Sequence, residues 1–395
     1  MSLEYQKLGD VADFIRGITY KPNDLVDNFS EGSTVCMRTA NVQVQLKQDD
    51  LLSVPANLVK NKDKFLIEGD ILVSTANSWN LVGKCCWIPK LEYSATAGGF
   101  ISILRANQEK LDQRYLYHWF NSPNTQLLAR NCGRQTTNIS NMDLDRCLSI
   151  KIPLPPLSEQ RRIASILDQA DELRQKRLQA IEKLDQLLQA TFIDMFGDPV
   201  SNPKGWVSST LGEQCEVGTG STPSRQNADY FEGNIPWVKS TEVDWGTITY
   251  TSETISEDGK NSARLKIYPK GSIILALYGQ GITRGKSALL GIEATLNQAC
   301  AALIPKEPIS NYFVFSFLRF SYENLRNQAR GGNQENLNLN IVKSFPIYLP
   351  PNELQEKWSK IALGIEDQKQ NLYKQLNMQN QLFSSLQTQA FNGSL

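Results

Sequence analysis

The sequence predicts an α+β fold in which two tandem mixed α/β modules are separated by two long antiparallel helices, which form a coiled coil with approximate two-fold symmetry. Three observations lead to this prediction. The chain of 395 residues is longer than a single hydrophobic core usually organises. Its sequence repeats with a period of roughly 200 residues, and each copy ends in a Pro-Pro pair followed by a long amphipathic segment.

The repeat is defined by short motifs that recur in the same order. Leu8-Gly9-Asp10 matches Leu211-Gly212-Glu213, an offset of 203 (211 minus 8). The other matches are Gly69-Asp70-Ile71-Leu72 with Gly271-Ser272-Ile273-Ile274, Gly83-Lys84 with Gly285-Lys286, and Ile152-Pro153-Leu154-Pro155-Pro156 with Ile347-Tyr348-Leu349-Pro350-Pro351. Little identity lies between these motifs. A common framework therefore carries two different sets of surface side chains.

Each module is predicted to combine short strands with one helix. Apolar runs at 71–73 and 273–277 are separated from the next segments by Gly and Asn turns, which is typical of strands. Asp112 opens a helix in the first copy, and Ser310 or Asn311 opens one in the second. The aromatic residues of both helices are spaced like core residues, so we favour a core role for them over base stacking.

The segments after the two Pro-Pro pairs are predicted to be helices of about 39 residues, or roughly 58 Å each. Asn352 with Gln355 resembles a capping box, and Ser158 with Glu159 is a weaker start signal. Gly197 ends the first helix. Helices of this length with one apolar side are expected to pack on each other, which would place the modules at opposite ends of a rod. The alternative is that each helix folds back on its own module.

Apolar residues recur along both helices at heptad spacing. In the second helix this apolar seam is interrupted by glutamines, and polar residues at such positions help to set the register of a coiled coil. The face of the first helix is wide enough to bury against more than one partner. The residues predicted to lie in the coiled coil or to dock a partner are Ile163, Leu167, Leu178, Ile181, Leu188, Trp358, Ile361, Ile365 and Leu372, with Leu173, Leu187 and Leu382 on the same seams.

Composition excludes several classes of protein. Lys and Arg number 41, as do Asp and Glu, so a protein that grips nucleic acid by bulk charge alone is not expected. Seven cysteines without a Cys-x-x-Cys pair argue against a disulfide framework or a zinc ribbon and favour the cytoplasm. The one histidine, His118, lies in an aromatic helical stretch, where a packed structural role outweighs a catalytic one. No apolar run is long enough to span a membrane.

The most tempting chemical motif is the loop at 278–287, which follows an apolar run and ends in Gly-Lys-Ser like a phosphate-binding loop. Its spacing fails by one residue because position 280 is Gln, so a nucleotide site is not favoured. The loop instead offers flexible backbone with side chains that bond base edges and phosphates: Gln280, Thr283, Arg284 and Lys286, with Lys84 at the matching position in the first copy.

A second polar stretch precedes each Pro-Pro pair, at 133–140 and at 330–337, and both are rich in Gly, Gln and Asn with an Arg. Gln and Asn pair bidentately with adenine and Arg with guanine, so such loops suit base readout in a major groove. The alternative is a polar surface turn. The candidate DNA contacts are Arg134, Gln135, Thr137 and Asn138 in the first copy and Arg330, Gln334 and Asn336 in the second.

Several motifs together resemble the specificity subunits of type I restriction-modification systems, and the resemblance covers nearly the whole chain. It rests on Pro-Leu-Pro-Pro-Leu-Ser-Glu-Gln-Arg-Arg-Ile-Ala at 153–164, Met195-Phe196-Gly197-Asp198-Pro199, the stretch from Trp206 to Gly212, Gly220-Ser221-Thr222-Pro223-Ser224, Ile235-Pro236-Trp237-Val238 and Leu349-Pro350-Pro351. One departure is Asn352-Glu353-Leu354-Gln355, where the first copy has Leu157-Ser158-Glu159-Gln160.

The resemblance implies a non-catalytic, DNA-binding subunit for host defence. Target-recognition domains at 1–157 and 197–351 would each read one half of a bipartite site in double-stranded DNA. Spacer helices at 158–196 and 352–395 would hold them about one helical turn apart and dock two methyltransferase subunits. Restriction and translocase subunits would join through the complex. S-adenosylmethionine, ATP and magnesium would be used by the partner subunits, and none is implied to bind this chain.

Two rival functions remain at this point. A stand-alone enzyme would use the loop from Gly281 to Ser287, and the purified chain would then hydrolyse ATP or cut DNA. A purely structural coiled-coil scaffold would make no DNA contacts. The neutral charge is compatible with a DNA reader only if partner subunits supply phosphate contacts, because those contacts set affinity while base contacts set sequence.

Overall fold

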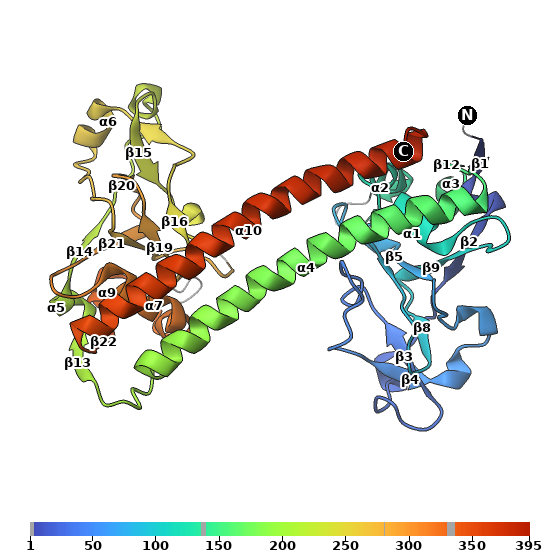
Figure 1. Cartoon of the computed structure of the whole chain (residues 1–395), viewed down its shortest axis with the longest axis horizontal. Helices are drawn as coiled ribbons and strands as arrows, with labels where there is room; N and C mark the ends of the chain where they lie inside the picture. The colour runs from blue at the N-terminus through green and yellow to red at the C-terminus, as the bar shows by residue number, and fades with distance from the viewer. Residues whose placement is uncertain (1–3, 136–139, 280, 330–335) are drawn as a thin grey trace. The chain divides into compact units, whose positions relative to one another are not determined.

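The computed structural model describes residues 4–135, 140–279, 281–329 and 336–395. The chain divides into two compact units, which consist of residues 1–178 with 374–395, and of residues 179–373. Each unit is a mixed α/β module that includes one half of each of two long helices, α4 (Leu157–Phe196) and α10 (Asn352–Asn392) (Figure 1). The predicted α+β class with two long helices is confirmed.

The first unit is built on a four-stranded antiparallel sheet with the order β2-β9-β5-β7. In the three-stranded sheet β4-β3-β8, the pair β3–β8 is parallel. Small sheets β1-β12 and β10-β11-β6 complete the module. The strands are β1 (Tyr5–Lys7), β2 (Ala12–Arg16), β3 (Ser33–Met37), β4 (Ser53–Pro55), β5 (Ile71–Ser74), β6 (Ala76–Asn77), β7 (Cys85–Trp87), β8 (Ala95–Ala97), β9 (Ile101–Ala106), β10 (Gly133–Gln135), β11 (Ser140–Met142) and β12 (Lys151–Pro153), with helices α1 (Gln113–Phe120), α2 (Pro123–Asn131) and α3 (Leu144–Leu148).

The second unit repeats most of this topology, and its main sheet gains a fifth strand, β16, which pairs in parallel with β19. Its order β14-β21-β18-β19 matches β2-β9-β5-β7, the trio β17-β15-β20 matches β4-β3-β8 including the parallel pair, and β13-β22 matches β1-β12. The strands are β13 (Val207–Thr210), β14 (Cys215–Thr219), β15 (Ile235–Val238), β16 (Thr247–Ile248), β17 (Thr254–Ile255), β18 (Ile273–Ala276), β19 (Ser287–Leu290), β20 (Thr295–Leu296), β21 (Cys300–Pro305) and β22 (Pro346–Leu349), with helices α5 (Leu211–Gln214), α6 (Glu257–Ser262), α7 (Asn311–Phe320), α8 (Tyr322–Arg326) and α9 (Leu339–Ser344). The internal repeat is therefore a repeat of fold.

The aromatic helices lie where the sequence predicts them. The side chain of Asp112 accepts hydrogen bonds from the first turn of α1, and Ser310 does the same for α7, so Ser310 rather than Asn311 is the N-cap. Tyr115 and Phe120 are fully buried against the first sheet, as is Phe313 against the second. The core role predicted for these aromatics is confirmed.

The long helices pair antiparallel inside each unit. In the first unit, Arg174 Nε on α4 donates to Asn380 Oδ1 on α10 at 2.7 Å. In the second unit, Lys369 Nζ on α10 donates to Asp185 Oδ1 on α4, also at 2.7 Å. These contacts correspond under the repeat, because 174 and 369 differ by 195, as do 185 and 380. The predicted pairing is confirmed within each unit.

The helix seams are buried chiefly where a module covers them. Ile163 and Leu167 belong to the core of the first unit, and Leu188, Trp358 and Ile365 belong to that of the second. Ile181 is also buried, and Ile361 and Leu372 are half-buried. Leu178 is 44% exposed, and the seam residues Leu173, Leu187 and Leu382 are exposed as well, so these four side chains are not buried in the coiled coil, and their part in docking a partner stays a prediction. Two paired helices bury only a narrow stripe on each other, so a wide apolar face stays partly exposed wherever no module covers it.

The start of each long helix depends on a buried glutamine. Gln160 Nε2 donates to the carbonyls of Pro155 at 2.8 Å and Lys110 at 3.0 Å, and its Oε1 accepts from Asp112 N at 2.8 Å. Gln355 repeats this arrangement, donating to Pro350 O at 2.8 Å and accepting from Ser310 N at 3.0 Å. The glutamine thus joins the Pro-Pro turn to the N-terminus of the module's aromatic helix.

This role corrects the predicted helix-start signals. Helix α4 begins at Leu157, so Ser158 already lies inside the helix, and Gln355 bonds the Pro-Pro turn instead of closing a capping box with Asn352. The prolines determine this outcome, because their carbonyls lie at the turn before the helix and need donors from outside it.

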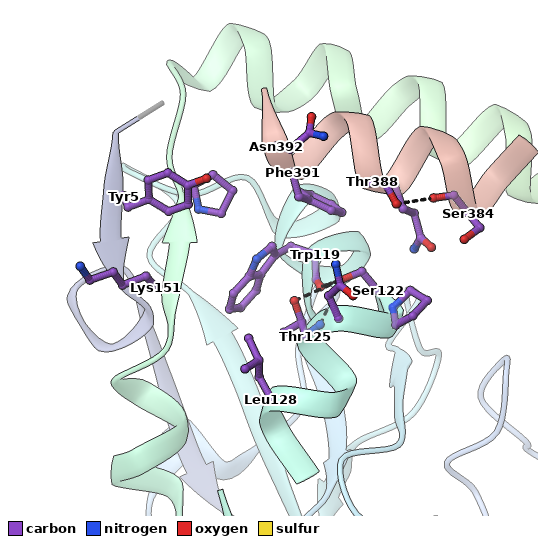
Figure 2. A pocket seen from close by; sticks show the side chains of 14 residues that line it. Tyr5, Trp119, Ser122, Thr125, Leu128, Lys151, Ser384, Thr388, Phe391 and Asn392 are labelled. Atoms are coloured by element: carbon purple, nitrogen blue, oxygen red, sulfur yellow. Dashed lines mark hydrogen bonds between the residues drawn. The ribbon is translucent and has the colours of Figure 1, made fainter. Parts of the chain in front are cut away.

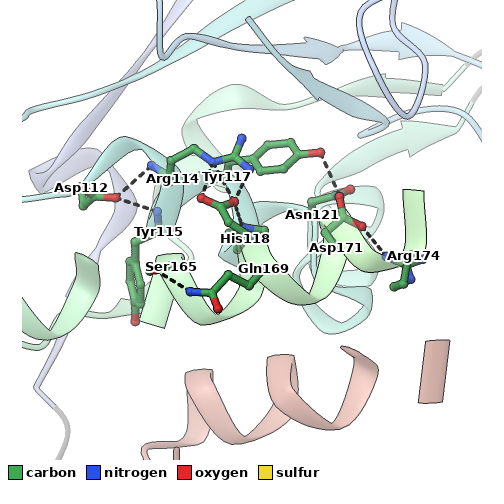
Figure 3. A network of polar contacts seen from close by, with 11 residues as sticks. Asp112, Arg114, Tyr115, Tyr117, His118, Asn121, Ser165, Gln169, Asp171 and Arg174 are labelled. Carbon is green, nitrogen blue, oxygen red and sulfur yellow. Dashed lines mark hydrogen bonds and ion pairs between the residues drawn. The ribbon is translucent and has the colours of Figure 1, made fainter. Parts of the chain in front are cut away.

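A polar cluster ties α1 to α4 in the first unit (Figure 3). Asp168 on α4 accepts from His118 Nε2 at 2.7 Å and from Arg114 Nε at 2.9 Å. The Arg114 guanidinium also lies over the Trp87 ring, 4.5 Å from its centroid. His118 is buried at 1% exposure, which confirms its packed structural role. Burial of Asp168 favours a raised pKa, but the hydrogen bonds from His118 and Arg114 outweigh it and lower the pKa to about 2.

We predict that Gln160→Leu and Gln355→Leu each lower the free energy of unfolding by about 1–3 kcal/mol, because each leaves buried backbone groups without partners. Urea denaturation of the full chain measures this loss. Gln169→Leu is the control, since Gln169 is exposed on α4 and its side chain bonds the exposed Ser165 on that helix. Equal losses in all three variants would contradict the assigned role.

A second prediction concerns pH. The pKa of Asp168 is lower in the folded chain than in the unfolded one, so its contribution is present above about pH 4 and is lost as the pH falls toward 2. We expect Asp168→Asn to destabilise the chain by about 1 kcal/mol at pH 6, a value discounted for partial exposure, and by less at pH 2. Unfolding curves between pH 6 and 2 test this, with Glu172→Gln as an exposed control. A pH-independent difference would show that the carboxylate charge plays no part.

Candidate nucleic-acid interface

In the first unit, two segments that lie far apart in the sequence meet at one edge of the module. Strand β6, which follows β5, pairs with β11 in the register Ser140↔Asn77 and Asn141↔Ala76. The contact continues with a hydrogen bond from Met142 N to Thr75 O at 2.8 Å. The loop after β5 and the paired strands β10 and β11, each a candidate for base readout, therefore meet at this edge.

The second unit brings the equivalent segments together. Leu337 N, at the end of the second polar stretch, donates to the carbonyl of Leu277, the residue after β18, at 3.1 Å. A further pair of bonds matches between units, from Thr75 N to Phe100 O at 2.9 Å and from Leu277 N to Ala299 O at 2.8 Å. Among the described residues, both modules thus join the end of the central strand to the chain that leads to the Pro-Pro pair.

The repeated Gly-Lys pair closes the loop after the central strand in the same way in both units. Gly83 N donates to Ser74 O at 2.8 Å, and Gly285 N donates to Ala276 O at 2.9 Å. The φ angles of these glycines are +84° and +88°, a left-handed conformation that side chains with a Cβ rarely adopt. Each glycine therefore fixes the point at which the loop rejoins the sheet, and this point does not depend on which side chains the loop contains.

The loop at 281–286 is held from outside, in contrast to the flexible backbone that the sequence predicts. Tyr322 Oη on α8 donates to Ile282 O at 2.6 Å, and Arg326 donates to the carbonyls of Gly281 at 2.5 Å and Arg284 at 3.2 Å. The Tyr322–Arg326 pair has the spacing of one helical turn. The four-residue spacing is the sequence signal for these bonds to the loop. Sequence reasoning missed it because α8 is five residues long, too short for a helical pattern to be recognised.

The two predicted lysines are occupied by partners in their own modules. Lys84 Nζ donates to Gln43 Oε1 at 2.5 Å, and Lys286 Nζ lies 2.6 Å from Asp244 Oδ1, with its side chain only 13% exposed. A phosphate contact by either lysine would therefore compete with a partner that the lysine already has. Thr283, Arg284 and Asn336 are half-buried at the same surfaces.

Other predicted contacts are not described. Arg134 and Gln135 lie in β10, whose backbone pairs with β11, but the positions of their side chains are not described. Thr137, Asn138, Gln280, Arg330 and Gln334 lie outside the described residues. Their assignment as DNA contacts stays a prediction.

The structure adds one exposed aromatic to the first surface. Phe100 is 67% exposed, and its carbonyl accepts hydrogen bonds from Thr75 N and Ala76 N, which places it beside β6. Its counterpart in the second unit is Ala299. Sequence reasoning missed Phe100 because only the strand register shows that the residue lies next to the loop after β5.

Both units also expose large apolar side chains on their halves of the long helices. A helix face that stays in solvent usually carries polar and charged residues instead. The exposed apolar side chains are Leu173, Leu178, Leu187 and Ile193 on α4 and Leu363, Tyr373, Met378 and Leu382 on α10. We call this set the exposed helix residues.

The chemistry of the remaining residues is modest. All seven cysteines are buried and free, and burial raises the pKa of the Cys36, Cys86 and Cys215 thiols to about 12. Among the described residues, no group of three or more His, Cys, Asp or Glu side chains could hold a metal ion. In the same residues, no helix combines the length and the apolar character that crossing a membrane requires.

Comparison with known proteins identifies relatives over the whole length. The family model of the type I restriction modification DNA specificity domain matches residues 2–183 and 203–378. The putative type I restriction enzyme MjaX specificity subunit of Methanocaldococcus jannaschii is 25% identical, over 92% of this chain and 87% of the relative. The StySPI specificity subunit of Salmonella potsdam is 24% identical, over 98% and 87%.

Solved structures share the fold. The S subunit of a type I restriction-modification system from M. genitalium matches with a TM-score of 0.60 at 17% identity, over 99% of this chain and 96% of that chain. A chain from a study of complex assembly and conformational transition of the type I R-M system matches with a TM-score of 0.55 at 18% identity, over 100% of both. With both modules matched by the family model, the chain belongs to the family of type I restriction-modification DNA specificity domains.

Proposed function

We propose that this chain is the subunit that gives a type I restriction-modification complex its DNA sequence specificity, with each module reading one half of a bipartite site. The observation that carries the proposal is the duplicated surface. In each unit the backbone just after the central strand accepts a hydrogen bond from the stretch that precedes the Pro-Pro pair, from Met142 N to Thr75 O in the first unit and from Leu337 N to Leu277 O in the second. The side chains differ, as with Phe100 and Ala299, so the two surfaces suit two different base sequences.

The charge balance supports a division of labour with partner subunits. The chain carries 41 basic and 41 acidic residues, and Lys84 and Lys286 are held by partners in their own modules. Phosphate contacts supply most of the salt-dependent affinity of DNA-binding proteins, whereas base-edge contacts set sequence. We infer that the partner subunits provide much of the phosphate contact and that this chain provides the readout.

The exposed helix residues are the proposed docking surface for two methyltransferase subunits. These side chains are apolar although they face solvent, where charged residues are usual. Each unit carries one half of both helices, so the chain offers two similar docking surfaces. Methyl transfer with S-adenosylmethionine, and ATP- and magnesium-dependent steps, are assigned to partner subunits, and the complex acts on DNA in the cytoplasm. The chain itself is proposed to be non-catalytic.

The first test exchanges one module. Replacing residues 1–150 with the equivalent module of a relative should change one half of the methylated site and leave the other half unchanged, as read by mapping methylated bases across the genome of cells that carry the complete system. The reciprocal exchange of residues 203–345 should change the other half. A change in both halves from one exchange would rule out independent readers, and methylation that ignores both exchanges would rule out the function.

The second test changes the length of the helices. Inserting seven residues in α4 after Leu178 and in α10 after Tyr373, where the two units divide, lengthens both helices by about 10 Å. We expect the unread spacer to grow by about 3 base pairs, at 3.4 Å per pair, with both half-sites retained. The same insertion in the 198–206 segment, outside the helices, is the control. An unchanged spacer would show that the helices do not set it.

A further inference from the structure

The first unit contains a pocket that the proposed DNA readout does not use. It lies between the edge of β1 and β12, helix α2 and the last turns of α10, and its volume is about 270 Å³. Figure 2 shows the rings of Tyr5, Trp119 and Phe391 around it, with Leu128 on the α2 side. Cofactor and drug sites usually measure about 300–1,000 Å³. This pocket is better matched to one large side chain than to a cofactor.

The second unit shows what fills the equivalent place there. Pro153 in β12 corresponds to Tyr348 in β22, 195 residues later. Asp112 and Ser310 are equivalent because each bonds the glutamine of its own unit, and this equivalence aligns Trp119 with Phe317, seven residues after each of them. The rings of Tyr348 and Phe317 lie edge to face with centroids 5.8 Å apart. Tyr348 Oη donates to Val200 O at 3.0 Å, in the segment that follows α4. At this position the second unit has the packed ring of Tyr348, whereas the first unit has Pro153 and a pocket.

The wall of the pocket also carries an unused polar group. Gln387 on α10 lines the pocket and is 4% exposed, and its side chain makes no hydrogen bond with any residue that the structure describes. The corresponding residue in the second unit is Phe192, which is fully buried among aromatic rings. The Gln387 amide atoms are not among the polar atoms that are fully shielded from solvent, so the amide keeps access to the pocket and can bond an occupant that brings its own hydrogen-bonding group. A phenol combines that group with an aromatic ring.

The rim of the pocket is suited to protein. Tyr5 and Leu128 line the pocket and are each about half exposed, at 50% and 49%, so they give it an apolar border. Lys151 is the only charged side chain in the lining, so a nucleotide phosphate would find one cation at most. A polypeptide partner that inserts a side chain would cover both the rim and the pocket.

We propose that this pocket receives a tyrosine side chain from a methyltransferase subunit, in the place that Tyr348 fills within the second unit. The choice of partner rests on the proposed function, in which those subunits contact this chain. The phenol ring packs among Tyr5, Trp119 and Phe391, and its hydroxyl bonds the Gln387 amide. The two modules then differ in partner contact: one supplies the tyrosine itself, and the other takes it from the partner.

The test fills the pocket from within. Pro153→Tyr reproduces the residue found at the matching position of β22, and it keeps the Pro153 carbonyl that accepts from Tyr115 Oη at 2.9 Å. We expect calorimetry of the full chain with the purified methyltransferase subunits, without DNA, to show at least a tenfold loss of affinity at one of two sites. Val207→Tyr, which adds an exposed ring to β13, is the control and should leave the affinity unchanged. Should Pro153→Tyr fail to fold, Thr388→Trp fills the pocket from α10.

A small-molecule probe tests the chemistry of the pocket directly. We expect p-cresol to raise the melting temperature of the full chain more than toluene does, and Pro153→Tyr to abolish the effect. Gln387→Leu should remove the preference for p-cresol. Unchanged partner affinity in a folded, pocket-filled variant would overturn the docking proposal, and so would p-cresol that fails to bind. Because these assays contain no DNA, their failure is distinct from a failure of half-site reading.

Discussion

The buried glutamine at the start of each long helix is the contact on which the arrangement of each unit depends. Gln160 and Gln355 bond a Pro-Pro turn on one side and the N-terminus of an aromatic helix on the other. Three parts of the chain, the turn, the module helix and the long helix, are thereby oriented by one amide. Since buried backbone groups need partners, the position of the module on the helix has little freedom. The surfaces proposed to read DNA are carried by modules attached in this way.

Comparison of the two copies distinguishes the framework residues, which recur in both units, from the surface residues, which differ. The glutamine, the Pro-Pro turn, the left-handed glycines at 83 and 285, and the polar contacts Arg174–Asn380 and Lys369–Asp185 recur at matching positions. These residues define the frame of each unit. Phe100, Ala299, Pro153 and Tyr348 occupy matching positions with different chemistry, and they lie at the proposed interfaces. The same framework can therefore carry different recognition surfaces without a change of fold.

Sequence reasoning succeeded where a local signal was sufficient. The motif offsets predicted the repeat, the helix ends were placed within one residue at Leu157 and Phe196, and aromatic spacing predicted the core. It failed where the outcome depends on residues far away. Leu178 fits a heptad but lies exposed, because the paired helix covers only a stripe. The meeting of β6 with β11 depends on strand register, and the role of Gln355 depends on a helix 45 residues earlier, so neither carries a local signature.

The division of the two units along the chain has a consequence for synthesis on the ribosome. The second unit is one continuous stretch, residues 179–373, whereas the first needs residues 374–395 to complete its core, where Ala390 is buried and the Phe391 ring lies edge to face with Tyr115. The module made first is thus completed last. Until the final turns of α10 emerge, the apolar seam of the early part of α4 has no helix to cover it, so the nascent chain exposes apolar surface during that interval.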